Sequence, residues 1–170
     1  MTRAYIGIGS NIIPAANVRA ALRSLARQTQ LVGISTVYLT AALGRPEQQP
    51  YYNCVAAIET EMPPPVLKHI LRNIENSQGR QRTEDKFAPR TIDLDLLVYG
   101  DLAIDAEGMR LPDPEILERP FLAIPLCELA PDMVLAGQNR RISEIAAGMA
   151  PMEMQPLLDY SLGLRKELLD

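Results

Sequence analysis

The residues best placed to do chemistry are two aspartates separated by one leucine, Asp93 and Asp95, inside an apolar segment. Successive side chains of a β-strand point to opposite faces, so both aspartates would lie on one face. The apolar residues that would enter the core from the other face are Ile92, Leu94, Leu96 and Val98. Adjacent carboxylates repel each other unless a cation joins them, and Mg²⁺ commonly takes one or two carboxylates. The spacing alone leaves two interpretations open, a magnesium site and an acidic edge strand that faces solvent.

A basic segment leads directly into this acidic pair. Between residues 80 and 90, four cationic side chains accompany only two acidic ones, in a chain whose net charge is −4. The four are Arg80, Arg82, Lys86 and Arg90. Arginine forks bind phosphate oxygens, and carboxylates hold the metal that bridges those oxygens. The combination favours a metal–phosphate substrate, whereas the segment without the aspartates would be read as a solvated charged loop.

Several residues could form a pocket for an aromatic ring. Tyr51 and Tyr52 precede Asn53, and Phe87 and Phe121 lie in segments expected to be loops. A planar amide offers a donor and an acceptor to the edge of a heterocycle, and aromatic side chains stack on its face. Ordinary packing in the core or at its rim explains the same residues, and composition alone favours that interpretation.

Other common kinds of site are absent from the sequence. It contains neither a GxxxxGK[ST] phosphate loop nor the third glycine that would make Gly7-Ile8-Gly9 a dinucleotide fingerprint. The single histidine, His69, lies among helical residues and suggests no Ser-His-Asp or Cys-His system. Cys54 and Cys127 lack metal-binding spacing and are expected to be reduced.

Composition limits the class of protein. A chain of 170 residues with 47% hydrophobic and 22% charged residues is expected to be one globular domain, residues 1–170. Its acidic balance removes the main reason to propose nucleic-acid or anionic-membrane binding. It has no apolar stretch long enough to span a bilayer and no signal peptide. We therefore expect a cytoplasmic monomer that acts on small molecules.

The elements that must position these residues follow from hydrophobic spacing and turn residues. They are a strand at 4–9, a helix from Pro14, strands at 31–39 and 53–60, a helix from Pro63 that stops at Gly79, and a strand at 92–99. This β-α-β-β-α-β order is typical of a ferredoxin-like α+β fold, with helices on one face of an antiparallel sheet. The apolar face of the second helix would contain Val66, Leu67, Ile70, Leu71 and Ile74.

The last third of the chain is less regular. Five prolines are expected to divide residues 111–132 into turns and short helical fragments. A short helix is predicted near 141–149 and a C-terminal helix at 163–169. Together they form a helical extension to the ferredoxin-like core.

Specific motifs run through most of the sequence. The sharpest is Ala-Pro-Arg-Thr-Ile-Asp-Leu-Asp-Leu at residues 88–96, and others lie at residues 4–11, 51–60, 74–82, 111–112 and 118–132. On these residues the chain closely resembles the 6-hydroxymethyl-7,8-dihydropterin pyrophosphokinases of folate biosynthesis. The family's ferredoxin-like fold agrees with the order of elements predicted above.

The resemblance implies a reaction and a set of ligands. The β,γ-diphosphate of ATP would pass to the primary hydroxyl of the pterin, with release of AMP. Two Mg²⁺ ions would be held by Asp93 and Asp95. ATP would contact Glu75, Arg80, Arg82, Arg90 and Arg119, and catalysis would depend on Arg80, Arg90 and Asp95. The pterin would contact Thr40, Leu43, Tyr51, Asn53, Phe87 and Phe121.

The sequence departs from the family pattern at three places. Ala41-Ala42 stands where the family often has two prolines, Asp113 where it usually has histidine, and Gly108 where some members have arginine. The last two bear on ATP affinity, because an aspartate repels a triphosphate unless a cation intervenes. Two alternative functions are therefore kept: another two-metal nucleotidyltransferase, and a non-catalytic or weakly active pterin-binding relative.

Overall fold

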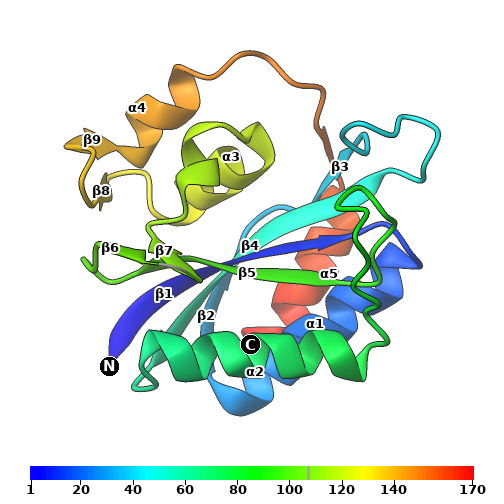
Figure 1. Ribbon diagram of the computed structural model, residues 1–170, viewed down its shortest axis with the longest axis horizontal. Coiled ribbons are helices and arrows are strands. Elements are labelled where there is room, and N and C mark those ends of the chain that lie inside the picture. Colours follow the sequence, from blue (N-terminus) through cyan, green and yellow to red (C-terminus); the bar gives the residue numbers. More distant parts are fainter. Residues whose placement is uncertain (107) are drawn as a thin grey trace.

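A six-stranded antiparallel sheet forms the centre of the computed structural model, which describes residues 1–106 and 108–170 (Figure 1). The strands follow the order β10-β3-β4-β1-β5, and β2 also pairs with β4. Their bounds are β1 (Thr2–Ser10), β2 (Gln30–Ile34), β3 (Tyr38–Thr40), β4 (Tyr51–Thr60), β5 (Asp93–Tyr99) and β10 (Gln155–Pro156). Two small hairpins join β6 (Ile104–Ala106) to β7 (Met109–Leu111) and β8 (Val134–Leu135) to β9 (Arg140–Arg141). Strand β5 is an edge strand, so one of its sides is free to face ligands.

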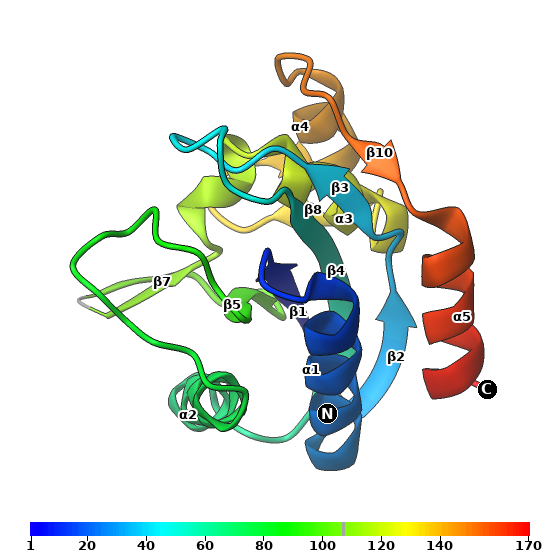
Figure 2. The same ribbon diagram turned by 90° about the vertical axis from the view of Figure 1, so that its right-hand side faces the viewer.

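Helices pack on both faces of this sheet, as Figures 1 and 2 show. They are α1 (Pro14–Gln28), α2 (Pro64–Ser77), α3 (Pro120–Leu129), α4 (Ile142–Ala147) and α5 (Leu158–Leu168), with a 3-10 turn η1 (Pro114–Leu117). One core lies between the sheet and α1, α2 and α5, and a second lies between the sheet and α3 and α4. The α+β class is confirmed, but the prediction of helices on a single face is incomplete because α3 and α4 cover part of the other face.

Helix α1 begins at Pro14 as the sequence predicts, and α2 begins one residue after the predicted Pro63. Both have proline in the first turn, where the missing N–H costs no hydrogen bond. Helix α2 ends at Ser77, and Gly79 follows the C-cap Gln78 with a φ of 76°, the left-handed conformation that glycine adopts freely. Its apolar face differs by one residue from the prediction, because Val66 is 45% exposed.

Irregularities in the sheet explain two further differences. The predicted strand 31–39 is two strands, β2 and β3, because Ser35 between them uses its hydroxyl to accept the Val55 N–H at 2.8 Å. On the other side of the sheet, the register of β1 with β5 shifts between Tyr5 and Ile6. Val98 consequently packs in the core under α3 rather than with Leu94.

The C-terminal third is more ordered than its prolines indicate. Helix α3 is continuous over ten residues although Pro125 lies inside it. Helix α4 agrees with the prediction, and α5 begins five residues before the predicted start. The short strand β10 pairs with β3 and so attaches this segment to the sheet edge. No helix in the described parts of the chain is long and apolar enough to cross a membrane.

Candidate active site

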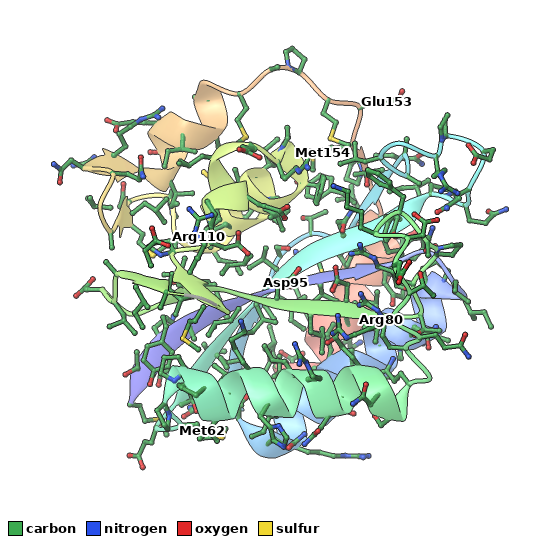
Figure 3. The ribbon with its side chains drawn as sticks, in the orientation of Figure 1. Met62, Arg80, Asp95, Arg110, Glu153 and Met154 are labelled. Atoms are coloured by element: carbon green, nitrogen blue, oxygen red, sulfur yellow. The ribbon has the colours of Figure 1, made fainter. Side chains whose placement is uncertain are left out.

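Two clefts meet at strand β5. The first, which we call the sheet-face cleft, has a volume of about 340 Å³ and lies on the sheet beside α3. The second, the sheet-edge cleft, has a volume of about 420 Å³ and lies between β5, α2 and the β7–η1 segment. Asp93 and Asp95 line both clefts, as does Glu115. Figure 3 labels Asp95 below α3 and Arg80 closer to the start of β5.

Two glycines of β1 form the floor of the sheet-face cleft. Gly7 pairs with Asp95 on one side, and Gly9 lies between Asp93 and Asn53. A Cβ atom on Gly9 would lie 2.8 Å from Oδ1 of Asn53, closer than real Cβ atoms approach an oxygen. Glycine at this position therefore keeps the floor low and leaves the Asn53 amide in place.

All six residues predicted to contact a pterin line the sheet-face cleft. Nδ2 of Asn53 donates to Oγ1 of Thr40 at 2.8 Å, and both side chains are buried. Tyr51 and Phe121 are half-buried, whereas Leu43 and Phe87 are exposed at the rim. Strands β3 and β4 position the polar pair, and β4 also carries Tyr51. Leu43 and Phe87 come from loops, whereas Phe121, which was expected in a loop, lies in the first turn of α3.

Arginines neutralise Asp93. Nη1 of Arg80 lies 3.0 Å from Oδ1 of Asp93, and Nη1 of Arg90 lies 2.5 Å from Oδ2. The Arg80 side chain is 8% exposed, and the same nitrogen also donates to Oε2 of Glu75 and to the carbonyl of Ile92. In this arrangement Arg80 holds Asp93 in position, and Arg90 is the more accessible of the two guanidinium groups.

Glu75 is a buried carboxylate that organises the entry to β5. It accepts from Arg80 at 2.8 Å and from Arg82 at 2.7 Å. It also accepts from the Leu94 N–H at 3.4 Å, which gives a partner to a backbone group on the free side of the edge strand. Glu75 and Arg82 line the sheet-edge cleft, whereas Arg90 and Arg119 line the sheet-face cleft.

Asp95 is a carboxyl group without a cationic partner. Within residues 1–106 and 108–170, no cationic side chain forms an ion pair with it. Asp95 is exposed to the cleft, but the surrounding walls reduce its hydration. This desolvation, together with the negative charges of nearby carboxylates, raises the pKa of Asp95 to about 8. Those carboxylates are Asp93, Asp113, Glu75 and Glu115. A cation beside Asp95 would relieve this repulsion.

The residues present fit Mg²⁺ when the substrate supplies further ligands. Carboxylate oxygens are hard ligands, and Mg²⁺ usually keeps waters and phosphate oxygens in addition to one or two carboxylates. The described residues contain no group of three His, Cys, Asp or Glu side chains placed to hold a metal by themselves. Asp93 and Asp95 can therefore provide part of a coordination shell that phosphate oxygens would complete.

The sheet-edge cleft combines basic and acidic walls. Its basic residues are Lys68, Arg72, Arg82 and Arg110. Asp113 lies on the acidic side, where it accepts the Glu115 N–H at 2.9 Å and caps η1, and its burial raises its pKa. Gly108 also lines this cleft. Two of the three departures from the family pattern, Asp113 and Gly108, thus line the sheet-edge cleft.

Sequence reasoning missed several lining residues. Lys68 and Arg72 lie one helical turn apart on α2, and Arg72 precedes Glu75 by three residues, so their helical spacing was an available signal. Gly7 and Gly9 indicated close packing but not the floor of a cleft. Gln48 and Glu115 had no local signal, because only the folded chain brings them to the sheet-face cleft.

Replacing Asp95 by asparagine is expected to stabilise the ion-free protein. A folded-state pKa above the usual aspartate value makes the folded protein lose stability as pH rises from about 4 to about 8. Removing the carboxylate removes that loss. The melting temperature of Asp95→Asn, measured with a chelator, should exceed that of the parent protein at pH 8.5 and differ little at pH 4.5. An equal or lower melting temperature at pH 8.5 would contradict the uncompensated charge.

Gly9→Ala should disturb the cleft floor. The new Cβ would displace Asn53 and break its hydrogen bond to Thr40, so we expect a loss of about 1–3 kcal/mol in the free energy of unfolding. Chemical denaturation measures this loss. Gly163→Ala in α5 is the matched control, because no atom lies within 4 Å of its Cβ position, and it should be neutral or stabilising. Equal effects of the two substitutions would refute the role of Gly9.

Comparisons with known proteins identify the family of this chain. A model of the family described as 7,8-dihydro-6-hydroxymethylpterin-pyrophosphokinase matches residues 5–131. The 2-amino-4-hydroxy-6-hydroxymethyldihydropteridine pyrophosphokinase of Haemophilus influenzae is 39% identical over 157 residues, which cover 91% of this chain and 97% of that protein. The protein of the same name from Pseudomonas aeruginosa is 36% identical over 148 residues, which cover 85% of this chain and 90% of that protein.

Solved structures support the fold. A crystal structure of HPPK-DHPS from Plasmodium falciparum superimposes with a TM-score of 0.69 over 86% of this chain, at 11% sequence identity. This chain spans 43% of that longer protein, so the match concerns the fold of one part of it. The family match over residues 5–131 and the two bacterial relatives show that the chain belongs to the 7,8-dihydro-6-hydroxymethylpterin-pyrophosphokinase family.

Proposed function

We propose that this chain, as one domain over residues 1–170, transfers a diphosphate group from ATP to 6-hydroxymethyl-7,8-dihydropterin in folate synthesis. Family membership supports the reaction and ATP as co-substrate. The observation that carries the assignment of the site is the position of Asp93 and Asp95, on the wall shared by an aromatic-lined cleft and a basic cleft. The pterin hydroxyl and the ATP phosphates would meet at this wall.

The sheet-face cleft is the proposed pterin site. Tyr51, Phe87 and Phe121 provide rings that can stack on a planar heterocycle. Asn53 is fixed by its bond to Thr40, so its remaining amide groups are already oriented toward the edge of a ring. Leu43 completes the rim. This arrangement supports binding of a flat, polar heterocycle over an extended or bulky substrate.

The sheet-edge cleft is the proposed ATP site. Arg82 reaches it from the loop after α2, and Lys68 and Arg72 reach it from α2 itself. Arg90 and Arg119 approach the same reacting region from the sheet-face side. Glu75 would affect ATP binding indirectly, by holding the arginines with which it pairs. Arg80 would also act indirectly, by holding Asp93 in position. Cationic groups on both sides of β5 would neutralise a triphosphate that passes across the shared wall.

Two Mg²⁺ ions are proposed to bind at Asp93 and Asp95, where they would supply neutralisation of the phosphate charge. The reaction forms a bond between the pterin oxygen and the β-phosphorus and breaks the bond from that phosphorus to the oxygen that leaves with AMP. The hydroxyl proton is lost, and Asp95 lies where it could accept it. Phosphoryl transfer requires little covalent participation by the protein, so positioning and charge carry most of the catalysis.

We further propose that the protein works as a cytoplasmic monomer on small molecules, without a nucleic-acid or membrane partner. The acidic net charge supports the part of this proposal that concerns nucleic acid and anionic membranes. Of the two alternatives, another two-metal nucleotidyltransferase is set aside by the family match. A weakly active pterin-binding relative is retained because Asp113 places a carboxylate on the wall of the proposed ATP site.

The decisive assay incubates the protein with ATP, Mg²⁺ and 6-hydroxymethyl-7,8-dihydropterin and separates the nucleotides. We expect AMP and the pterin diphosphate, and no free inorganic pyrophosphate. Asp95→Ala should lower turnover by about 10²–10³-fold because a group that neutralises the reacting phosphates is lost. Asp101→Asn, on the exposed turn after β5, should leave turnover unchanged.

Near-normal AMP release by Asp95→Ala would refute the assigned role of Asp95. If the parent protein binds the pterin but releases no AMP, the weakly active alternative replaces the enzyme assignment. In that case, Asp113→His should restore nucleotide binding if Asp113 is the cause.

A further inference from the structure

Two loops meet at the mouth of the sheet-face cleft. The β3–β4 loop consists of residues 41–50, and the α2–β5 loop consists of residues 78–92. Figure 1 shows them on the same side of the sheet, beyond the end of β1. The first loop contributes Leu43 to the cleft, and the second contributes Phe87 and Arg90. The positions of these lining residues therefore depend on how the loops are held.

Three contacts join the loops directly. Nη2 of Arg45 lies 2.7 Å from Oδ2 of Asp85. Nε2 of Gln48 donates to the carbonyl oxygen of Phe87 at 2.7 Å. The Phe87 ring packs against Gly44, where a Cβ atom would lie 3.1 Å from ring atom Cε1 and where φ is +73°. We call these five residues the inter-loop clasp; all its contacts converge on Phe87 or on the turn before it.

Asp85 links the ion pair to Phe87. While Oδ2 binds Arg45, Oδ1 accepts the Phe87 N–H at 3.0 Å, and the Asp85 carbonyl accepts the Ala88 N–H. The carboxylate therefore closes the turn that presents Phe87 and anchors this turn to the opposite loop. Two hydrogen bonds to the Asp85 carboxylate thus connect the Arg45 side chain to the Phe87 backbone.

The clasp rests on a buried asparagine. Asn11 is 3% exposed, and its Nδ2 lies 3.2 Å from Oε1 of Gln48 and from the Gln49 carbonyl. Its Oδ1 accepts the Arg90 N–H at 2.8 Å. The base of both loops is thus fixed to the residue that follows β1 by partly buried hydrogen bonds. The tips depend on the clasp, where the Arg45 and Asp85 side chains are 42% and 40% exposed.

We propose that Arg45 and Asp85 are positioning residues that hold Phe87 in the wall of the sheet-face cleft. The proposal rests on the proposed function for the role of Phe87 toward the pterin. Without the ion pair, the turn that presents Phe87 loses one of the contacts that join it to the opposite loop, and part of the ligand's binding energy must then order the loop. Because an exposed ion pair contributes little, the expected loss of pterin affinity is about two- to fivefold.

The first test needs no ligand. The sequence contains no tryptophan, so Phe87→Trp introduces a single fluorescent reporter at the clasp. Adding Arg45→Ala should shift its emission to longer wavelength and speed the decay of its anisotropy, because the indole becomes more hydrated and mobile. Arg45→Lys should retain most of the parent signal. Glu47→Ala, an exposed acid on the same loop, is the matched control and should change neither quantity.

The second test asks whether the pair acts through Phe87. Pterin affinity is measured by calorimetry in the presence of a non-hydrolysable ATP analogue and Mg²⁺. Arg45→Ala and Asp85→Asn should each raise the pterin Kd about two- to fivefold, and the double variant should be no worse than either alone. In a Phe87→Ala background, Arg45→Ala should have no further effect. In turnover assays the KM for pterin should rise while kcat stays unchanged.

The outcomes separate this proposal from the proposed function. Unchanged fluorescence of the Phe87→Trp reporter on adding Arg45→Ala would overturn the positioning role, even if the parent protein is fully active. A further loss of pterin affinity from Arg45→Ala in the Phe87→Ala background would overturn it as well. If the parent protein neither binds pterin nor releases AMP, the proposed function fails, and the role assigned to the clasp in pterin binding fails with it.

Discussion

The site depends on two neighbouring carboxylates, of which only one is paired with arginines. Asp93 lies between two guanidinium groups, whereas Asp95, two residues along the same strand, has no ion-pair partner in the described chain. Ionising an unpaired carboxyl group whose hydration is reduced is costly, and four nearby carboxylates, Asp93 among them, increase the cost at Asp95. This arrangement lowers the stability of the folded protein at the point where its two clefts meet. Such a loss is typical of functional sites.

Simple features of the sheet create this point. Because β5 is an edge strand, its face opens onto one cleft and its side onto another. Glycines in β1 lower the floor beside the aspartates, and α3 covers only the far part of the same face. Glu75 then occupies the free edge of β5 and draws two arginines toward it. The sheet-face cleft and the sheet-edge cleft therefore share a wall without any long insertion.

Local patterns in the sequence predicted which residues come together at the two clefts. The alternation of Asp93, Leu94 and Asp95 places both acids on one face of a strand, since side-chain direction in a strand depends only on position. The six residues expected to contact a ring come together in one cleft, although their roles in binding remain predictions. The family motif at residues 88–96 located the core of the site, and the structure supplied its neighbours.

Long-range relations were not predictable. Glu75 lies in the last turn of α2, and its ion-pair partners Arg80 and Arg82 lie in the loop that follows. No helical periodicity therefore relates the three residues. Pro125 locally favours a helix break, but α3 accommodates it because the apolar residues around it bury against the sheet. The division of the strand 31–39 at Ser35 depends on a hydroxyl bond to β4. In each case tertiary contacts outweighed the local preference.

The most direct test of the account is paramagnetic line broadening in the backbone NMR spectrum, with Mn²⁺ replacing Mg²⁺ and a non-hydrolysable ATP analogue present. A metal at the shared wall of the two clefts should first broaden the amides of residues 93–95, and Asp95→Asn should abolish the effect. Broadening centred on other acidic groups, such as Asp101 or Glu153, with residues 93–95 unaffected, would contradict the assignment of the carboxylate pair as the metal and phosphate site.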